Sequence, residues 1–184
     1  MTSRRDNPSD PVAFVFEATE VGWIDFRIPS LTSRLIQATH LGDPFPDLLQ
    51  WLESILDGAE SARWAIGEEG QMTQLVFLRA AHAGIDHMED RLLLLSTSFR
   101  EDELASRPVE AMNLIRDVYG AFRAFAEGPV YSPDDWEWDE EKDDCYDGHR
   151  LRDLRSRKIE AALRRGPEPE QLELRVGWSW RRRP

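Results

Sequence analysis

The four histidines and the single cysteine are the residues best suited to chemistry at neutral pH, because imidazole and thiol groups bind metal ions and exchange protons. Only His82 and His87 lie close together among the histidines, five positions apart. A structural zinc site needs four such ligands, and one cysteine cannot form a zinc knuckle. Cys145 precedes His149 by four positions, but the surrounding carboxylates would disfavour its thiolate. These residues therefore predict neither a metal site nor a nucleophile.

The segment from Asp134 to Asp147 carries nine carboxylates and is the other place where ligand chemistry could arise. Calcium prefers oxygen ligands, and an EF-hand supplies them at fixed positions around an invariant glycine. If Gly148 is that glycine, Cys145 replaces an oxygen ligand and Leu154 replaces the bidentate glutamate. An EF-hand is therefore excluded, although these carboxylates could hold a divalent cation in another arrangement.

The sequence contains no motif for nucleophilic catalysis or nucleotide binding. It has no Gly-x-Ser-x-Gly turn, which would present a nucleophilic serine. It also has no glycine-rich loop followed by Lys-Ser or Lys-Thr, which would bind the phosphates of a nucleotide. Carboxylate pairs such as Glu68-Glu69 fit solvated turns. We predict no catalytic residue and no cofactor, and keep an enzyme with an unrecognised site around His40, Asp25 or Arg27 as an alternative.

The most distinctive feature of the sequence is an acidic, aromatic arm at residues 129–149. Trp136 and Trp138 stand among its carboxylates. This mixture suits a basic protein partner, because opposite charge raises the association rate and a buried indole supplies affinity. The predicted contacts are Asp135, Trp136, Trp138 and Glu140. The alternative is that the arm folds back onto the basic stretch of residues 150–165.

Charge and composition narrow the function classes further. A net charge of −12 disfavours phosphate backbones and anionic lipid as partners. Residues 150–165 hold seven basic and two acidic side chains, but the adjacent acidic arm would compete with nucleic acid for them. One cysteine excludes an internal disulfide, the polar first 11 residues lack a secretory core, and no stretch has the roughly 20 apolar residues of a membrane-spanning helix. We therefore predict a cytoplasmic protein.

The hydrophobic pattern predicts an α+β fold. Ile24, Phe26 and Ile28 alternate with Trp23, Asp25 and Arg27, as in a strand with one buried face. Predicted strands cover residues 12–17, 21–28, 34–41, 61–66, 72–79 and 91–99. A helix starts at Asp43-Pro44 and ends at Gly58, a second covers residues 108–126, and residues 150–165 have helical character. This order favours a mainly antiparallel sheet of about six or seven strands with two or three helices packed on it.

Residues 172–180 predict one more strand with a single apolar face. Apolar residues alternate there with polar or small ones: Leu172, Leu174, Val176, Trp178 and Trp180. Such a strand would dock on the sheet of its own domain or on a second chain, which would make a homodimer. The predicted layout is a polar N-terminal tail (1–11), an α+β core (12–128), the acidic aromatic arm (129–149), a basic helix and C-terminal strand of the same domain (150–180), and a tail (181–184).

The opening strands from Phe14 to Ile28, the helix around Asp47–Leu52 and the hairpin from Trp64 to Phe77 resemble, in their spacing, small uncharacterised bacterial cytoplasmic proteins. Some of these are immunity proteins encoded beside secreted toxins. The resemblance covers roughly residues 12–126 and carries over no functional residue.

Three hypotheses about function follow from the sequence. The first is a non-enzymatic binding or regulatory protein, such as an immunity or antitoxin-like inhibitor of a basic protein. The second is a cytoplasmic secretion chaperone or adaptor, for which an exposed apolar groove and a dimer would be evidence. The third is the enzyme with an unrecognised site.

Overall fold

The computed structural model describes residues 7–20, 22–39, 43–68, 70–80, 89–97, 101–132, 136 and 151–165. Within these ranges the chain forms seven strands and three helices, so the α+β class is confirmed. The strands, however, make two antiparallel sheets, of three and four strands, instead of the single sheet that the sequence predicts.

The three-stranded sheet has the order β1-β2-β3, formed by Val15–Glu20, Trp23–Arg27 and Leu35–Thr39. The strands predicted at 12–17 and 21–28 are confirmed and pair as a hairpin. The first strand continues through residues 18–20, which lie between the two predicted strands, and the pairing shifts between Ala18 and Glu20. Ile24, Phe26 and Ile28 are fully buried, as their alternation predicts.

The four-stranded sheet has the order β4-β5-β6-β7, formed by Ser61–Glu68, Gln71–Leu78, Arg91–Thr97 and Glu101–Pro108. The hairpin of β4 and β5 and the strand β6 follow the prediction. Strand β7 was not predicted: no strand was expected between residue 99 and the helix at 108–126, because this stretch begins with Glu101-Asp102-Glu103. Consecutive acidic residues have low strand propensity, and pairing with β6 outweighs it.

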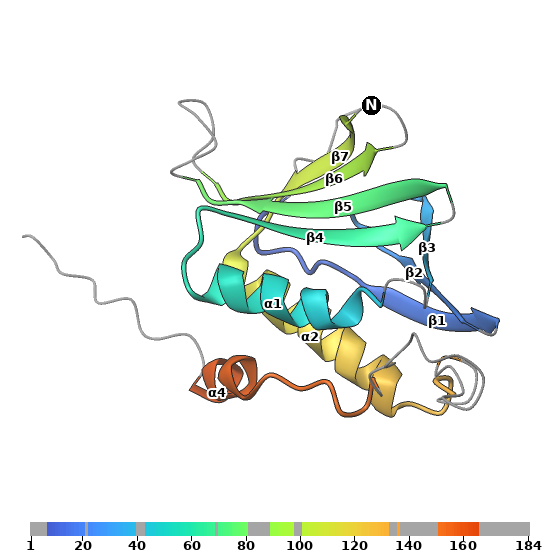
Figure 1. Cartoon of the computed structure of the whole chain (residues 1–184). Coiled ribbons are helices and arrows are strands. Elements are labelled where there is room, and N and C mark those ends of the chain that lie inside the picture. The colour runs from blue at the N-terminus through green and yellow to red at the C-terminus, as the bar shows by residue number, and fades with distance from the viewer. Residues whose placement is uncertain are drawn as a thin grey trace, which may run out of the picture.

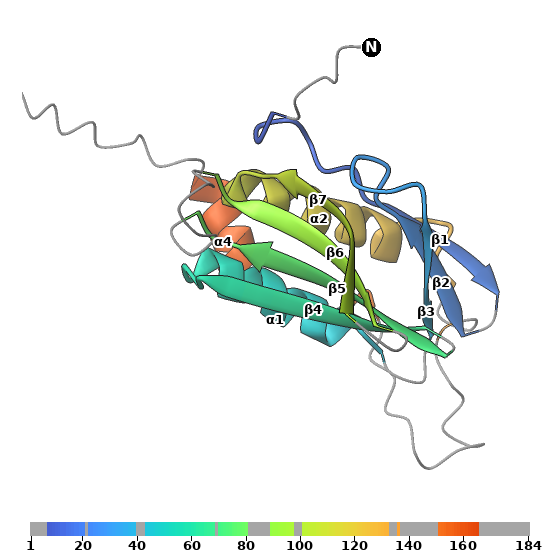
Figure 2. The same ribbon diagram turned by 90° about the horizontal axis from the view of Figure 1, so that it is seen from above.

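Helices α1 (Phe45–Leu56) and α2 (Ala111–Glu127) lie side by side under one face of the four-stranded sheet, while β1–β3 cross one end of the molecule (Figure 1, Figure 2). The Asp43 carboxylate accepts a hydrogen bond from the Phe45 N–H at 3.0 Å, and Gly58 ends the first helix with φ of +87°. The third helix, α4 (Arg157–Arg165), begins later than the basic stretch in which it was predicted.

One core joins both sheets and the helices. Its centre is aromatic: Trp64 stacks on Phe26 with ring centroids 5.5 Å apart and on Trp51 at 6.0 Å. Both indole N–H groups are satisfied by backbone carbonyls, since Trp64 donates to Pro44 at 2.8 Å and Trp51 donates to Ala62 at 3.1 Å. These bonds fix α1 against β4.

The two sheets are also joined by a buried carboxylate. Glu68, at the end of β4, accepts from the Arg34 guanidinium at 2.9 Å and from the Gln37 backbone N–H at 3.3 Å. Thr73 donates to the same carboxylate. A charge taken out of water in this way needs several hydrogen bonds, and Glu68 has them, so it holds β3 beside β4.

Candidate binding surface

An apolar groove lies between β1 and the C-terminal half of α2. It has a volume of about 330 Å³, within the range typical of ligand pockets. One wall comes from β1 and the residue before it, and the other from α2 and the turn after it. The lining residues are Phe14, Val15, Phe16, Ala121, Ala124, Phe125, Gly128, Pro129 and Val130.

Small residues on α2 create this space. Ala121, Ala124 and Gly128 lie on one face of the helix, because they are three and four positions apart. A Cβ atom at Gly128 would lie 2.7 Å from the Ala124 carbonyl oxygen, so only glycine fits where the chain leaves the helix. Pro129 follows and prevents further helix.

Aromatic contacts connect the groove to the start of the acidic arm. Phe16 stacks on Phe125 at 5.8 Å and contacts Phe45 at 6.2 Å. Trp136 meets Phe45 edge-on at 5.6 Å, and Tyr131 meets Phe125 at 5.7 Å. Tyr131 and Trp136 are 2% and 3% exposed, so these two side chains of the arm pack on the core next to the groove.

Of the four predicted partner contacts, only Trp136 belongs to the described residues, and its side chain is buried. A partner would reach the indole only if it left the core. Asp135, Trp138 and Glu140 lie outside the described residues, so their role as contacts stays a prediction. His40, His82, His87, His149 and Cys145 lie outside as well.

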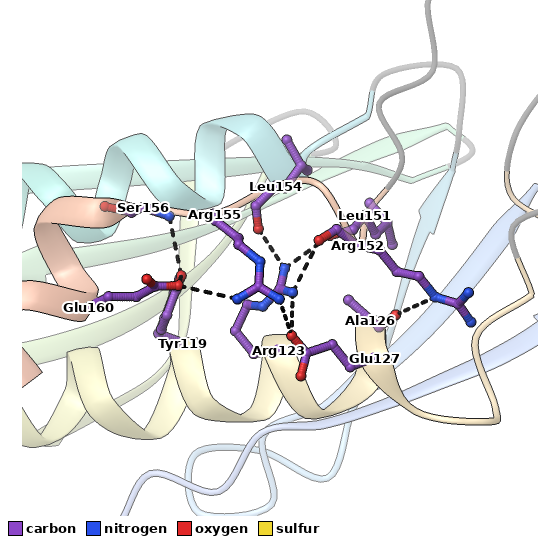
Figure 3. Close-up of polar contacts among 10 residues, drawn as sticks. All are labelled: Tyr119, Arg123, Ala126, Glu127, Leu151, Arg152, Leu154, Arg155, Ser156 and Glu160. Carbon is purple, nitrogen blue, oxygen red and sulfur yellow. Dashed lines mark hydrogen bonds and ion pairs between the residues drawn. The ribbon is translucent and has the colours of Figure 1, made fainter.

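Arg123 ties the chain that follows the arm to α2. Figure 3 shows its guanidinium pointing from the helix towards the segment at residues 151–154. It donates to three backbone carbonyls, those of Leu154 at 2.7 Å, Arg152 at 3.1 Å and Leu151 at 3.3 Å. It also pairs with the Glu127 carboxylate at 2.6 Å. The arginine is 8% exposed, so these bonds form away from bulk water.

A second set of polar contacts surrounds this arginine (Figure 3). Arg155 pairs with Glu127 at 2.5 Å and with Glu160 at 3.5 Å. The Arg123 hydrogen bond, with a smaller effect from Arg155, lowers the pKa of the Glu127 carboxyl. The Tyr119 hydroxyl donates to Glu160 and accepts from the Ser156 N–H, and burial raises its pKa. The Arg155–Glu127 pair and the two Tyr119 hydrogen bonds join α2 to α4 and the segment that leads into it.

The residues suggested for an unrecognised enzyme do not form a site within the described ranges. Asp25 is 6% exposed and accepts from the Gln37 side chain at 3.1 Å, a contact between neighbouring strands. The Arg27 side chain is exposed. Among the residues that the structure describes, no three carboxylate, imidazole or thiol groups gather as a metal site would require.

Two features escaped the sequence analysis. Arg123 stands four positions after Tyr119 and three before Ala126 on α2, so it belongs to the buried face of the helix. This position was the signal for a buried arginine. The groove had a weaker signal in the spacing of Ala121, Ala124 and Gly128. Such spacing does not reveal which neighbouring element leaves the space open.

Comparisons with known proteins add no relative: no family model, no curated protein and no solved structure matches this chain. None of the helices in the described ranges has the length and apolar character that a bilayer crossing requires.

Proposed function

We propose that this protein is a non-enzymatic binding protein that uses its acidic arm to hold a basic protein partner, as an immunity or antitoxin-like inhibitor does. One observation carries the proposal. The Leu151 N–H donates to the Tyr131 hydroxyl at 3.4 Å, so the two ends of the arm meet.

The side chains at this junction are buried and their partners are fixed. Leu151 is fully buried and its carbonyl accepts from Arg123, while the Arg152 guanidinium lies over the Tyr131 ring at 5.7 Å from the centroid. The 19 residues between Tyr131 and Leu151 carry nine carboxylates and two basic side chains. The carboxylates therefore belong to one short stretch of the chain whose two described ends are held together.

Charge concentrated in this way suits a cationic surface more than a small ligand. Electrostatic attraction raises the association rate, and aromatic side chains supply contact area. We assign the partner contacts to Asp135, Trp138 and Glu140, with Trp136 holding the start of the arm against Phe45. The occluded partner would be a basic protein, such as an enzyme whose substrate is a polyanion.

The test is a pull-down from the native host at low and at moderate salt, with mass spectrometry of the eluate. The wild-type chain is compared with the triple variant Asp135→Asn, Trp138→Ala, Glu140→Gln. A control variant neutralises two carboxylates elsewhere, Glu89→Gln and Asp153→Asn. We expect one basic protein that moderate salt weakens, that the triple variant loses and that the control retains. Equal retention by the triple variant would reject the arm as the contact site.

The groove favours a second candidate, a secretion chaperone or adaptor that holds an apolar segment of a client. Such a client would bind through apolar contacts, so moderate salt would not release it. Retention that survives salt and the triple variant, but is lost when Ala124→Glu places a charge in the groove, would support this alternative.

A further inference from the structure

We propose that the groove and the adjacent edge of β1 receive residues 172–180 from a second copy of this chain, so that two copies pair by reciprocal strand addition. This inference goes beyond the proposed function and does not depend on it. The exposed apolar side chains of the groove, the pattern of residues 172–180 and the reach of the chain each contribute to it.

The surface exposes apolar side chains that water solvates poorly. Val15 is 41% exposed and Val130 is 58% exposed, and both line the groove. They are two of the four large apolar side chains that stand out as exposed in the described part of the chain, with Met72 and Leu104. Apolar side chains that gather in one concave place, instead of being scattered, mark an interaction surface.

The same surface includes the edge of a sheet. Among the described strands, β1 pairs with β2 alone, so its other side presents backbone groups to an incoming strand. Phe14 and Phe16 point into the core, whereas Val15 and Glu17 are exposed. An added strand would therefore lie beside β1 and over the small residues of α2.

Residues 172–180 have the chemistry that this place requires. Their five apolar side chains fall on one face of a strand, and Ala121, Ala124 and Gly128 leave room for them along α2. On the other face, Arg175 can take the position opposite the exposed Glu17, and opposite charges across neighbouring strands are favourable. Lys, Pro or a run of charge would protect a strand edge, and β1 has none of these.

The reach of the chain favours a second copy over the chain's own segment. Helix α4, which ends at Arg165, and strand β1 lie at opposite ends of the molecule in both views (Figure 1, Figure 2). Glu160 bonds to Tyr119, and Gly128 follows Tyr119 by nine positions, about 14 Å along the helix axis. The link from Arg165 to Leu172 spans about 24 Å when fully extended. To bring the chain's own residues 172–180 to the groove, this link would have to run nearly fully extended back along α2. Residues 172–180 of a second copy are not limited by the length of this link.

Sedimentation of the full chain over a wide range of concentration tests the proposal. Ala124 is exposed on α2, so Ala124→Glu puts a charge in the groove without disturbing the core, and Gly120→Glu makes the same change at another exposed position of the helix. We expect a dimer for the wild-type chain and for Gly120→Glu. Ala124→Glu, Glu17→Arg and Arg175→Glu should each weaken dimerisation by about tenfold or more, and Glu17→Arg with Arg175→Glu should restore it.

Three results would overturn the proposal. A monomer at every concentration would exclude the second copy. A monomer in which Ala124→Glu changes the fluorescence of Trp178 or Trp180 would mean that the chain's own segment fills the groove. A dimer that neither Ala124→Glu nor the charge exchange affects would place the interface elsewhere. Circular dichroism of each variant checks that the fold is retained.

Discussion

Replacing Arg123 with methionine removes a guanidinium while keeping an unbranched apolar side chain in the buried face of α2. Four acceptors lose their donor at once: the carbonyl groups of Leu151, Arg152 and Leu154, and the Glu127 carboxylate. The segment at 151–156 has no helix or strand of its own, and the Arg123 bonds hold its first half on the body, while Tyr119 and Glu53 bond to Ser156 at its end. The variant therefore tests whether Arg123 positions the end of the acidic arm.

The expected cost can be estimated from these contacts. A hydrogen bond to a charged group contributes about 1.5–3 kcal/mol, but the four bonds are not independent, and Glu127 is half exposed and keeps Arg155 as a partner. Leaving a buried carbonyl without its donor costs about 1–3 kcal/mol. We expect a loss of about 3 kcal/mol in the free energy of unfolding, which lowers the Tm of a chain of this size by about 6–12 °C.

Urea unfolding gives the free energy, and hydrogen exchange locates the change. We expect faster exchange in residues 151–165, with strands β4 to β6 protected as before. Arg155→Met is the control, because its side chain is 53% exposed and surface ion pairs contribute at most about 1 kcal/mol. If Arg123→Met cost no more than Arg155→Met and left exchange at 151–165 unchanged, Arg123 would not hold this segment.

Two further predictions concern acid stability and the end of α2. Arg123 lowers the pKa of Glu127 below 4.5, so the folded state holds that proton less tightly than the unfolded chain; the resulting stabilisation is present above about pH 5 and is lost as the pH falls through the lowered pKa. The difference in unfolding free energy between wild type and Glu127→Gln should shrink below pH 4.5 in urea titrations, and a difference independent of pH would contradict this. Gly128→Ala should destabilise the fold by about 1–3 kcal/mol, because its Cβ would clash with a backbone oxygen. Gly120→Ala, with open space around it, should stabilise the fold by about 0.5–1 kcal/mol; thermal unfolding compares the pair, and equal effects would refute the clash.

The predicted elements that the structure confirms are those with a strong local signal. Helix α1 has an apolar stripe between Asp43, whose carboxylate accepts from the Phe45 N–H, and Gly58. In β2 the alternating apolar residues Ile24 and Phe26 are buried as predicted, although Asp25 between them is buried as well. The predicted helix at 108–126 lies within three residues of α2, whereas α4 begins seven residues after the start of the stretch at 150–165, since helix ends depend on contacts that residue pattern does not encode. Strand β7 was missed because its first residues are acidic, and only the partner strand β6 makes them a strand.

What the sequence by itself determined was the class of the fold, the buried faces of its main elements and the position of its acidic charge, because these follow from the periodicity and type of neighbouring residues. Only the tertiary structure decided that the strands divide into two sheets, that Trp136 turns into the core beside Phe45, and that Arg123 binds the carbonyls of a segment 28 to 31 residues away. It also decided that β1 and the small residues of α2 leave a groove between them. Each of these features is a contact between residues far apart in the chain, and such contacts depend on how the elements pack and not on local pattern.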